Sequence, residues 1–197
     1  MEEYYDARAP EYDDWYLGRG LFAGRDRPGW KRELARLVEV IASLPPTRTL
    51  DVACGTGFLT RHLRGAVVGL DQSARMLAQA RRQAPHATFV LGDALALPFP
   101  NDSFGRVFSG HFCGHLNQPE RERFLVEARS VAAELVVVDA SRAHVDVDEE
   151  MSQRTLNDGS RWEVYKRYLT GAGLAEELGG GRVLHEGRWF VVVGSPA

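Results

Sequence analysis

The stretch Leu50–Leu63, LDVACGTGFLTRHL, decides the fold of this 197-residue chain. It spans most of a short apolar run at Thr47–Ala53, a glycine-rich turn at residues 54–57 and most of a helix-like segment at residues 58–65. A buried strand, a glycine turn and a helix in this order form the first half of a βαβ unit, in which the next strand is parallel to the first. The sequence therefore predicts an α/β fold.

The same alternation continues along the chain. Helices are predicted after Ser73, as N-cap, and from Pro119, in the first turn. Strands between and beyond them are predicted at Ala66–Asp71, Thr88–Leu91, Phe104–Ser109 and Leu135–Asp139. Strands and helices that alternate in this way are typical of a parallel sheet with helices on both faces.

The C-terminal region departs from the pattern. Two apolar runs, Arg182–His185 and Trp189–Val193, follow a predicted helix near Gly173–Leu178 and are separated by only three residues. So short a link allows a hairpin but no crossover helix, so the last strand should be antiparallel. We predict a doubly wound, mostly parallel seven-stranded Rossmann-like sheet with an antiparallel C-terminal hairpin strand. Residues 1–46 lie outside this scheme, as do the polar residues 141–170, which show no clear strand.

Composition narrows the class of protein. The length suits a single domain, 1–197. The 24 Lys and Arg residues and the 27 Asp and Glu residues give a net charge of −3, and the basic residues are scattered, which argues against a nucleic-acid partner. Cys54 and Cys113 are far apart, so neither a disulfide framework nor a zinc site is expected. Without a signal peptide or a membrane-length apolar run, we expect a cytoplasmic protein that holds no metal.

Polar or glycine residues follow three successive predicted strands. They are Gly55 and Gly57 after the first, Asp71 at the end of the second, and Asp93 after the third. Because ligands of open α/β sheets bind outside the carboxyl ends of the strands, these positions together outline a nucleoside site. Taken singly, each Asp is better explained as a turn or helix cap. A dinucleotide site is disfavoured, because Thr60 stands where the fingerprint requires a small residue, and no P-loop lysine follows the glycines.

These segments carry a family resemblance. Residues 50–63, 68–80 and 92–109, with the C-terminal hairpin, resemble the class I S-adenosylmethionine-dependent methyltransferases, and among these the small-molecule group that includes the quinone-biosynthesis methyltransferases. The resemblance implies a helical cap at residues 1–46, a cofactor-binding core at 47–140, a substrate-side insertion at 141–170, and a last helix and hairpin at 171–197. The cofactor would be S-adenosylmethionine and the product S-adenosylhomocysteine.

The resemblance also implies roles for individual residues. Asp51, beside Gly55 and Gly57, would hold the methionine part of the cofactor, and Asp71 would accept hydrogen bonds from the ribose hydroxyls. Gln72 and Met76 would flank the adenine. The remaining implied cofactor contacts are Tyr5 and Tyr12 from the cap, Ala53 and Cys54 from the glycine turn, Gly92, Asp93 and Ala94 near the adenine, and Ser109 and Gly110 near the methyl group. For the two tyrosines, packing of a surface helix is an equal alternative.

His111 and His115 follow the fourth predicted strand and are the candidate catalytic residues. Their spacing would place them on one face of a helical turn, where either would assist deprotonation of the acceptor or orient it. The alternative is one structural, hydrogen-bonded histidine and one that faces solvent. A second candidate is Arg161–Tyr168, RWEVYKRY, whose aromatic and basic residues suit an anionic aromatic acceptor or, alternatively, an amphipathic helix packed on the core. RNA binding by so short a stretch is disfavoured.

The expected function is methyl transfer from S-adenosylmethionine to a small-molecule acceptor by a cytoplasmic monomer or homodimer. The alternatives are a non-catalytic regulator that binds S-adenosylmethionine, and a methyltransferase that acts on protein or RNA. For methylation of an amino group on a nucleobase, an N-P-P-Y-type motif is expected after the fourth strand, where residues 109–112 read SGHF.

Overall fold

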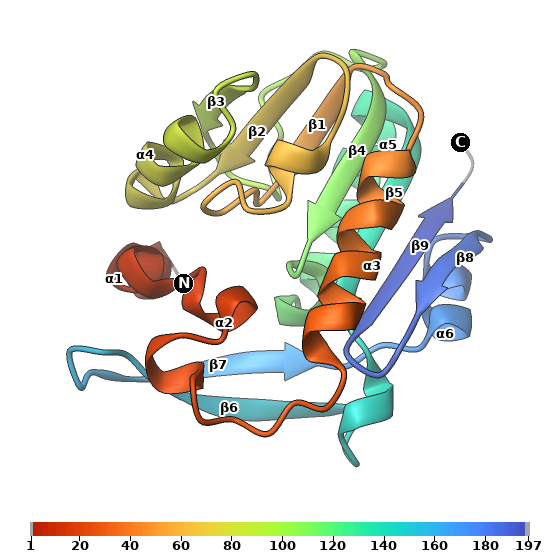
Figure 1. The fold of residues 1–197 in the computed structure, drawn as a ribbon. Helices are drawn as coiled ribbons and strands as arrows, with labels where there is room; N and C mark the ends of the chain where they lie inside the picture. The colour runs from red at the N-terminus through yellow and green to blue at the C-terminus, as the bar shows by residue number, and fades with distance from the viewer. Residues whose placement is uncertain (1, 196–197) are drawn as a thin grey trace.

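The computed structural model describes residues 2–195. Seven strands form one sheet in the spatial order β3-β2-β1-β4-β5-β9-β8 (Figure 1). Their bounds are β1 (Thr49–Val52), β2 (Val67–Asp71), β3 (Thr88–Leu91), β4 (Phe104–Gly110), β5 (Ala132–Ala140), β8 (Arg182–Glu186) and β9 (Phe190–Ser195). Strands β1 to β5 pair in parallel, and β9 is antiparallel to both β5 and β8. The predicted fold class is confirmed.

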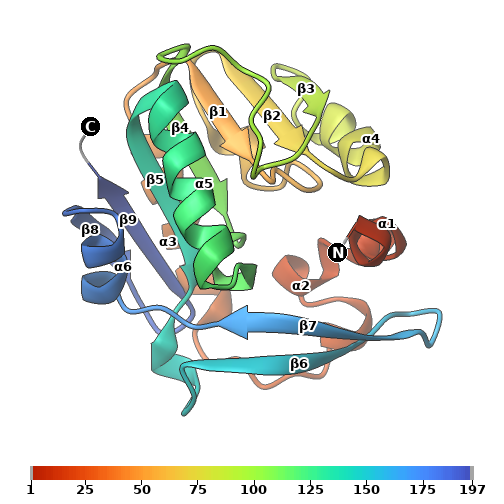
Figure 2. The same cartoon turned by 180° about the vertical axis from the view of Figure 1, so that it is seen from behind.

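Helices cover both faces of this sheet (Figures 1 and 2). One face carries α3 (Trp30–Ser43) and α4 (Ala74–Gln83), and the other carries α5 (Gln118–Val131) and α6 (Gly171–Glu177). Side chains of β4 and β5 point alternately to the two faces, so Phe108 packs with α3 whereas Val107 packs with Phe124 of α5. Burial of each such side chain contributes roughly 1.5–3 kcal/mol, so the sheet is held rigid from both sides.

Two helix starts are fixed by the side chains before them. The hydroxyl of Ser73 accepts a hydrogen bond from the Met76 N–H at the start of α4, which confirms the predicted N-cap. Asn117 and Glu120 form a reciprocal capping box at the start of α5. These caps set where each helix leaves the strand end before it.

The helix predicted directly after the glycine turn is wrong. Residues 58–65 form only a short 3-10 helix, Thr60–His62, and the chain is extended again at Leu63. The hydroxyl of Thr60 donates to Asp51 Oδ2 (2.6 Å), and Gly65 follows with a φ of 96°. A β-branched residue and a nearby glycine leave too few favourable positions to nucleate an α-helix.

Residues 141–170 hold a two-stranded sheet where no strand was predicted. β6 (Glu149–Thr155) and β7 (Arg161–Arg167) pair antiparallel around a tight turn at residues 157–159, in which Gly159 has a φ of 86°. The prediction of no strand, and the alternative of a helix at Arg161–Tyr168, are therefore wrong. The residues 157–159, Asn-Asp-Gly, were a usable hairpin signal, but β6 is almost entirely polar and exposed and so lacks the alternation that marks a strand.

The N-terminal segment lies between this hairpin and the main sheet (Figures 1 and 2). It contains α1 (Glu2–Arg8), a 3-10 helix (Ala9–Glu11) and α2 (Asp14–Leu17). Tyr4 of α1 forms a small core with Leu156 and Val164 of the hairpin region. On the other side, Ser73 donates to Asp6 of α1, so the segment is joined to both neighbours. No helix among residues 2–195 is long and apolar enough to span a membrane.

Candidate functional site

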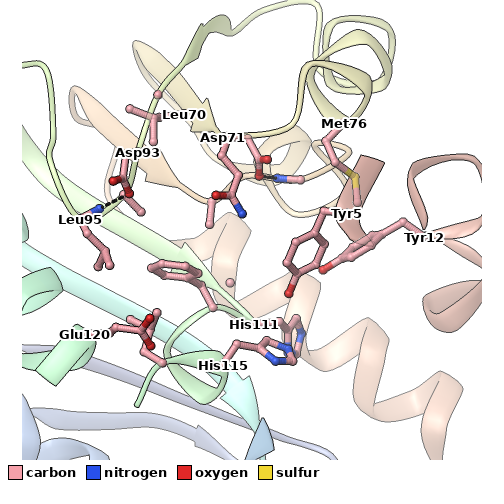
Figure 3. Close-up of a pocket in the computed structure, with 18 residues that line it drawn as sticks. Tyr5, Tyr12, Leu70, Asp71, Met76, Asp93, Leu95, His111, His115 and Glu120 are labelled. Atoms are coloured by element: carbon pink, nitrogen blue, oxygen red, sulfur yellow. Dashed lines mark hydrogen bonds between the residues drawn. The ribbon is translucent and has the colours of Figure 1, made fainter. Parts of the chain in front are cut away.

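A cavity of about 810 Å³ lies at the carboxyl ends of the parallel strands, where the strand order reverses between β1 and β4 (Figure 3). Its lining includes most of the predicted cofactor and catalytic residues: Tyr5, Tyr12, Ala53, Gly55, Asp71, Gln72, Met76, Gly92, Asp93, Ala94, Gly110, His111 and His115. Leu70, Leu95, Phe112, Leu116 and Glu120 also line it and were not predicted.

The Asp71 carboxylate is held by the backbone of the loops around it. The Gly55 N–H donates to Oδ2 and the Ser73 N–H to Oδ1, both at 2.9 Å. Burial raises the pKa of Asp71 above its ordinary value, although these backbone donors oppose the rise. The carboxylate therefore has a fixed orientation at the end of β2, and its remaining lone pairs suit a pair of hydroxyl donors.

Asp93 is more exposed and lies at the far end of the cavity (Figure 3). Its Oδ1 accepts the Leu95 N–H at 2.8 Å. One oxygen thus caps the turn after β3, as the capping alternative expected, while the side chain still lines the cavity. Gln72 and Met76, the predicted adenine neighbours, also line the cavity.

Three residues that line the cavity have an unusual backbone conformation. Ala53, Gly55 and His111 all have positive φ values, between 54° and 57°. A Cβ at Gly55 would meet only the Tyr12 ring, at 3.8 Å, so this glycine faces the ligand side. Positive φ values at the non-glycine residues Ala53 and His111 are uncommon and tend to gather at functional sites.

Four predicted residues lie outside this cavity. Asp51 and Cys54 line a smaller adjoining cavity, together with Tyr16 and Thr56. Burial raises the pKa of Asp51 to about 7, although the hydrogen bond from Thr60 opposes the shift. A buried carboxyl with this pKa favours a nearby cation, so Asp51 still suits the ammonium of an amino-acid ligand.

Gly57 and Ser109 line neither of these cavities. A Cβ at Gly57 would lie 3.0 Å from the Cα of Ala80, so the absence of a side chain allows α4 to pack against the turn. The Ser109 hydroxyl is buried and donates to the Val52 carbonyl at 3.2 Å. Both residues therefore support the elements around the site, and their contact with a cofactor stays a prediction.

Tyr5 and Tyr12 extend from the N-terminal segment over the cavity, with their hydroxyls toward the two histidines (Figure 3). Burial raises the pKa of both phenols. They remain neutral hydrogen-bond donors at physiological pH. Tyr12 is also covered by the Arg8 guanidinium, 4.8 Å from the ring centroid. The segment thus forms one wall of the site.

His111 lies directly after β4, among aromatic side chains. Its ring centroid is 5.0 Å from that of Trp15 and 5.8 Å from that of Phe190. The side chain is 9% exposed, and Nε2 has no hydrogen-bond partner among the described residues. Burial lowers the pKa of His111 to about 4, so the ring is neutral at physiological pH. An unpartnered, neutral imidazole nitrogen at a cavity wall suits an incoming polar ligand.

His115 ends a 3-10 helix, Cys113–His115, rather than sharing a helical turn with His111. Its Nδ1 lies 2.8 Å from the Tyr165 carbonyl of β7, so Nδ1 carries the proton. Burial, and then the Lys166 ammonium, lower the pKa of His115 to about 3. Neither histidine matches the expected solvent-facing alternative, because both line the cavity.

A buried ion pair supports this histidine loop and was missed by the sequence reasoning. Lys166 Nζ lies 2.6 Å from Asp139 Oδ1, and Asp139 Oδ2 accepts the Gly114 N–H at 2.7 Å. Burial would raise the pKa of Asp139, but the Lys166 ammonium lowers it to about 2. The pair connects β5, β7 and the loop between His111 and His115. Among residues 2–195 no cluster of side chains has a metal-binding arrangement.

This chain is similar to known proteins in both sequence and fold. Residues 49–135 match the model of a family described as a methyltransferase domain. The demethylmenaquinone methyltransferase of Thermotoga maritima is 36% identical over 132 residues, covering 64% of this chain and 54% of that protein. The 2-phytyl-1,4-naphtoquinone methyltransferase of Synechococcus elongatus is 32% identical, covering 83% of this chain and 72% of that protein. The chain spans about half the length of the first three curated relatives that it matches.

A solved structure extends the likeness over the whole chain. The complex of DhpI with SAM and HEP has a TM-score of 0.76 and is 27% identical, and the match covers 98% of this chain and 95% of DhpI. DhpI has also been solved as a complex with SAH, with a TM-score of 0.71 against this chain. The sequence matches, the strand order and the cavity where the strand order reverses all indicate the same family. The chain belongs to the class I S-adenosylmethionine-dependent methyltransferases.

Proposed function

We propose that this protein transfers a methyl group from S-adenosylmethionine to a small-molecule acceptor. The observation that carries the proposal is the cavity in which Asp71, the Gly55 turn and His111 converge at the strand-order reversal. The names of the matched relatives, which are methyltransferases of quinones, and the complex of DhpI with SAM support a small-molecule reaction.

The residues fit the cofactor by their chemistry. Asp71 suits the ribose hydroxyls, and Asp93 suits the exocyclic amine of the adenine. Asp51, whose pKa burial raises to about 7, would face the amino group of the methionine part. Asp51, Asp71 and Asp93 belong to the ends of β1, β2 and β3 in turn, which matches the order of amino acid, ribose and base along an extended ligand.

The protein's part in the reaction is positioning. When bound, S-adenosylmethionine supplies a methyl group on a positive sulfur, and this methyl bonds to the acceptor's nucleophilic atom as the sulfur keeps the electrons of the broken bond. Alignment of the two reactants can supply about 7–11 kcal/mol in favourable cases. His111 would orient the acceptor or take its proton, because Nε2 is unprotonated when Nδ1 holds the ring hydrogen. The N-terminal segment would exclude water.

The test is calorimetry followed by turnover. The wild-type protein should bind S-adenosylhomocysteine and S-adenosylmethionine at one site. With a panel of small hydroxyl and amine acceptors, it should release S-adenosylhomocysteine. Binding without turnover on any acceptor, protein and RNA included, would favour a regulator, whereas no binding of either nucleoside would contradict the proposal outright.

A further inference from the structure

A second cavity opens on the other side of the two histidines. It has a volume of about 1350 Å³ and lies between the N-terminal segment and the β6–β7 hairpin. His111, His115 and Tyr12 line both this cavity and the cofactor cavity. An acceptor in the second cavity would therefore meet the cofactor at His111, whose Nε2 is buried and unpartnered among the described residues.

The second cavity carries more positive than negative charge, because five basic side chains line it but, among the described residues, only the carboxylates of Asp26 and Glu150 do. Arg8, Arg25 and Arg154 all line it, and within residues 2–195 none of the three forms an ion pair. Partial burial, followed by repulsion from Arg154 and Arg8, lowers the pKa of Arg25. Guanidinium groups that repel one another around a cavity are stabilised by an anion placed between them.

The other charged groups in the lining do not remove this excess. The Lys166 ammonium is already neutralised by Asp139 beneath it. Glu150 accepts a hydrogen bond from the Tyr168 hydroxyl at 2.8 Å, on the rim formed by β6. Arg27 donates to the Trp15 carbonyl at 2.7 Å and lies over the Trp30 ring. Arg8 donates to the Tyr4 hydroxyl at 2.7 Å and Arg25 lies over the Phe22 ring, but among the described residues no carboxylate pairs with either of them or with Arg154. We call these three residues the arginine cluster.

Aromatic rings complete the cavity. Trp15, Trp30 and Trp189 contribute to its wall, with His144 packed 4.9 Å from Trp189 between ring centroids. Such rings give an organic ligand flat, apolar contact surface beside the charges. The combination suits an organic molecule with an anionic end.

We infer that the second cavity binds the methyl acceptor, and that the acceptor is a small organic anion whose carboxylate or phosphoryl group contacts the arginine cluster. Its nucleophilic atom would then lie beside His111, at the junction with the cofactor cavity. That the bound anion is the methyl acceptor rests on the proposed function. The presence of an anion-binding site in the second cavity does not.

The experiment measures binding of simple probes by calorimetry to the full chain, alone and saturated with S-adenosylhomocysteine. Benzoate and phenylphosphonate represent the two oxyanion types, and benzamide is the neutral probe of matching shape. We expect at least one anion to bind and benzamide to bind at least about tenfold more weakly. Comparison of the two anions identifies whether the site prefers a carboxylate or a phosphoryl group.

Variants locate the site. Arg25→Gln and Arg154→Gln should each weaken binding of the preferred anion about tenfold, while leaving the affinity for S-adenosylhomocysteine unchanged. Arg182→Gln, on exposed β8 and outside both cavities, is the matched control and should change neither affinity. The inference is overturned if neither anion binds, if benzamide binds equally well, or if the two cluster variants behave like the control. Failure of S-adenosylhomocysteine to bind the wild type overturns the proposed function instead, since anion binding to the protein alone is measured separately.

Discussion

The cofactor side and the acceptor side of the site are built in different ways. On the cofactor side, each ligand-facing group lies at the end of its own strand, so β1, β2 and β3 bring Gly55, Asp71 and Asp93 to one edge. On the acceptor side, the arginine cluster comes from α1, from the loop before α3 and from β6, and it depends on their packing. Local turns hold the first region, whereas tertiary contacts hold the second.

The largest effect should follow from breaking the ion pair under the acceptor side. Lys166→Met leaves the Asp139 carboxylate buried without its cation, which should lower the free energy of unfolding by about 3–5 kcal/mol. Chemical denaturation measures this loss. The double variant Asp139→Asn/Lys166→Met should recover much of the stability. A loss within about 1 kcal/mol, as is ordinary for exposed pairs, would show that the region does not depend on the pair.

The next effect concerns the cofactor side alone. Asp71→Ala removes the acceptor for the ribose hydroxyls and leaves the Gly55 N–H without its partner, so affinity for S-adenosylhomocysteine should fall by about 3–4 kcal/mol. Calorimetry measures the change, and Asp93→Ala should cost less because Asp93 is exposed. Equal losses of affinity in the two variants would contradict the claim that Asp71 contributes more to cofactor binding than Asp93.

The sequence predicts the cofactor side of the site better than the acceptor side. β3 has the predicted bounds Thr88–Leu91, and Ser73 caps α4 as predicted, because short β-branched apolar runs and N-caps are recognised from residues that are neighbours in the chain. The β6–β7 hairpin was missed because β6 is polar. Its role becomes visible only when Val164 packs on Tyr4, more than 150 residues away. No pattern of spacing reveals such a contact.

A third change tests the junction between the two sides. His111→Ala should lower turnover about 100-fold if Nε2 takes the acceptor's proton, in line with typical general-base contributions, while affinity for S-adenosylhomocysteine changes little. Steady-state rates with a methylated acceptor and calorimetry on the same samples separate the two effects. Unchanged turnover would remove His111 from the reaction and leave it a packing residue among the aromatic rings.

The smallest effect is a pH dependence on the cofactor side. The pKa of Asp51 is raised to about 7, so below pH 7 this carboxyl is protonated and must ionise before it pairs with the ammonium of the ligand. Affinity for S-adenosylmethionine should therefore fall about tenfold from pH 8 to pH 6. Asp51→Asn should bind more weakly at pH 8 and show a flatter profile. If the affinity of the wild type and of Asp51→Asn changed equally with pH, a group other than Asp51 would be responsible.

The most direct test of the central claim is a crystal structure of the protein with S-adenosylhomocysteine. We expect the ribose hydroxyls on Asp71, the adenine between Met76 and Asp93, and the sulfur beside Gly110, facing His111 and the second cavity. A ligand bound elsewhere, or one whose sulfur is closed off from the arginine cluster, would contradict the account.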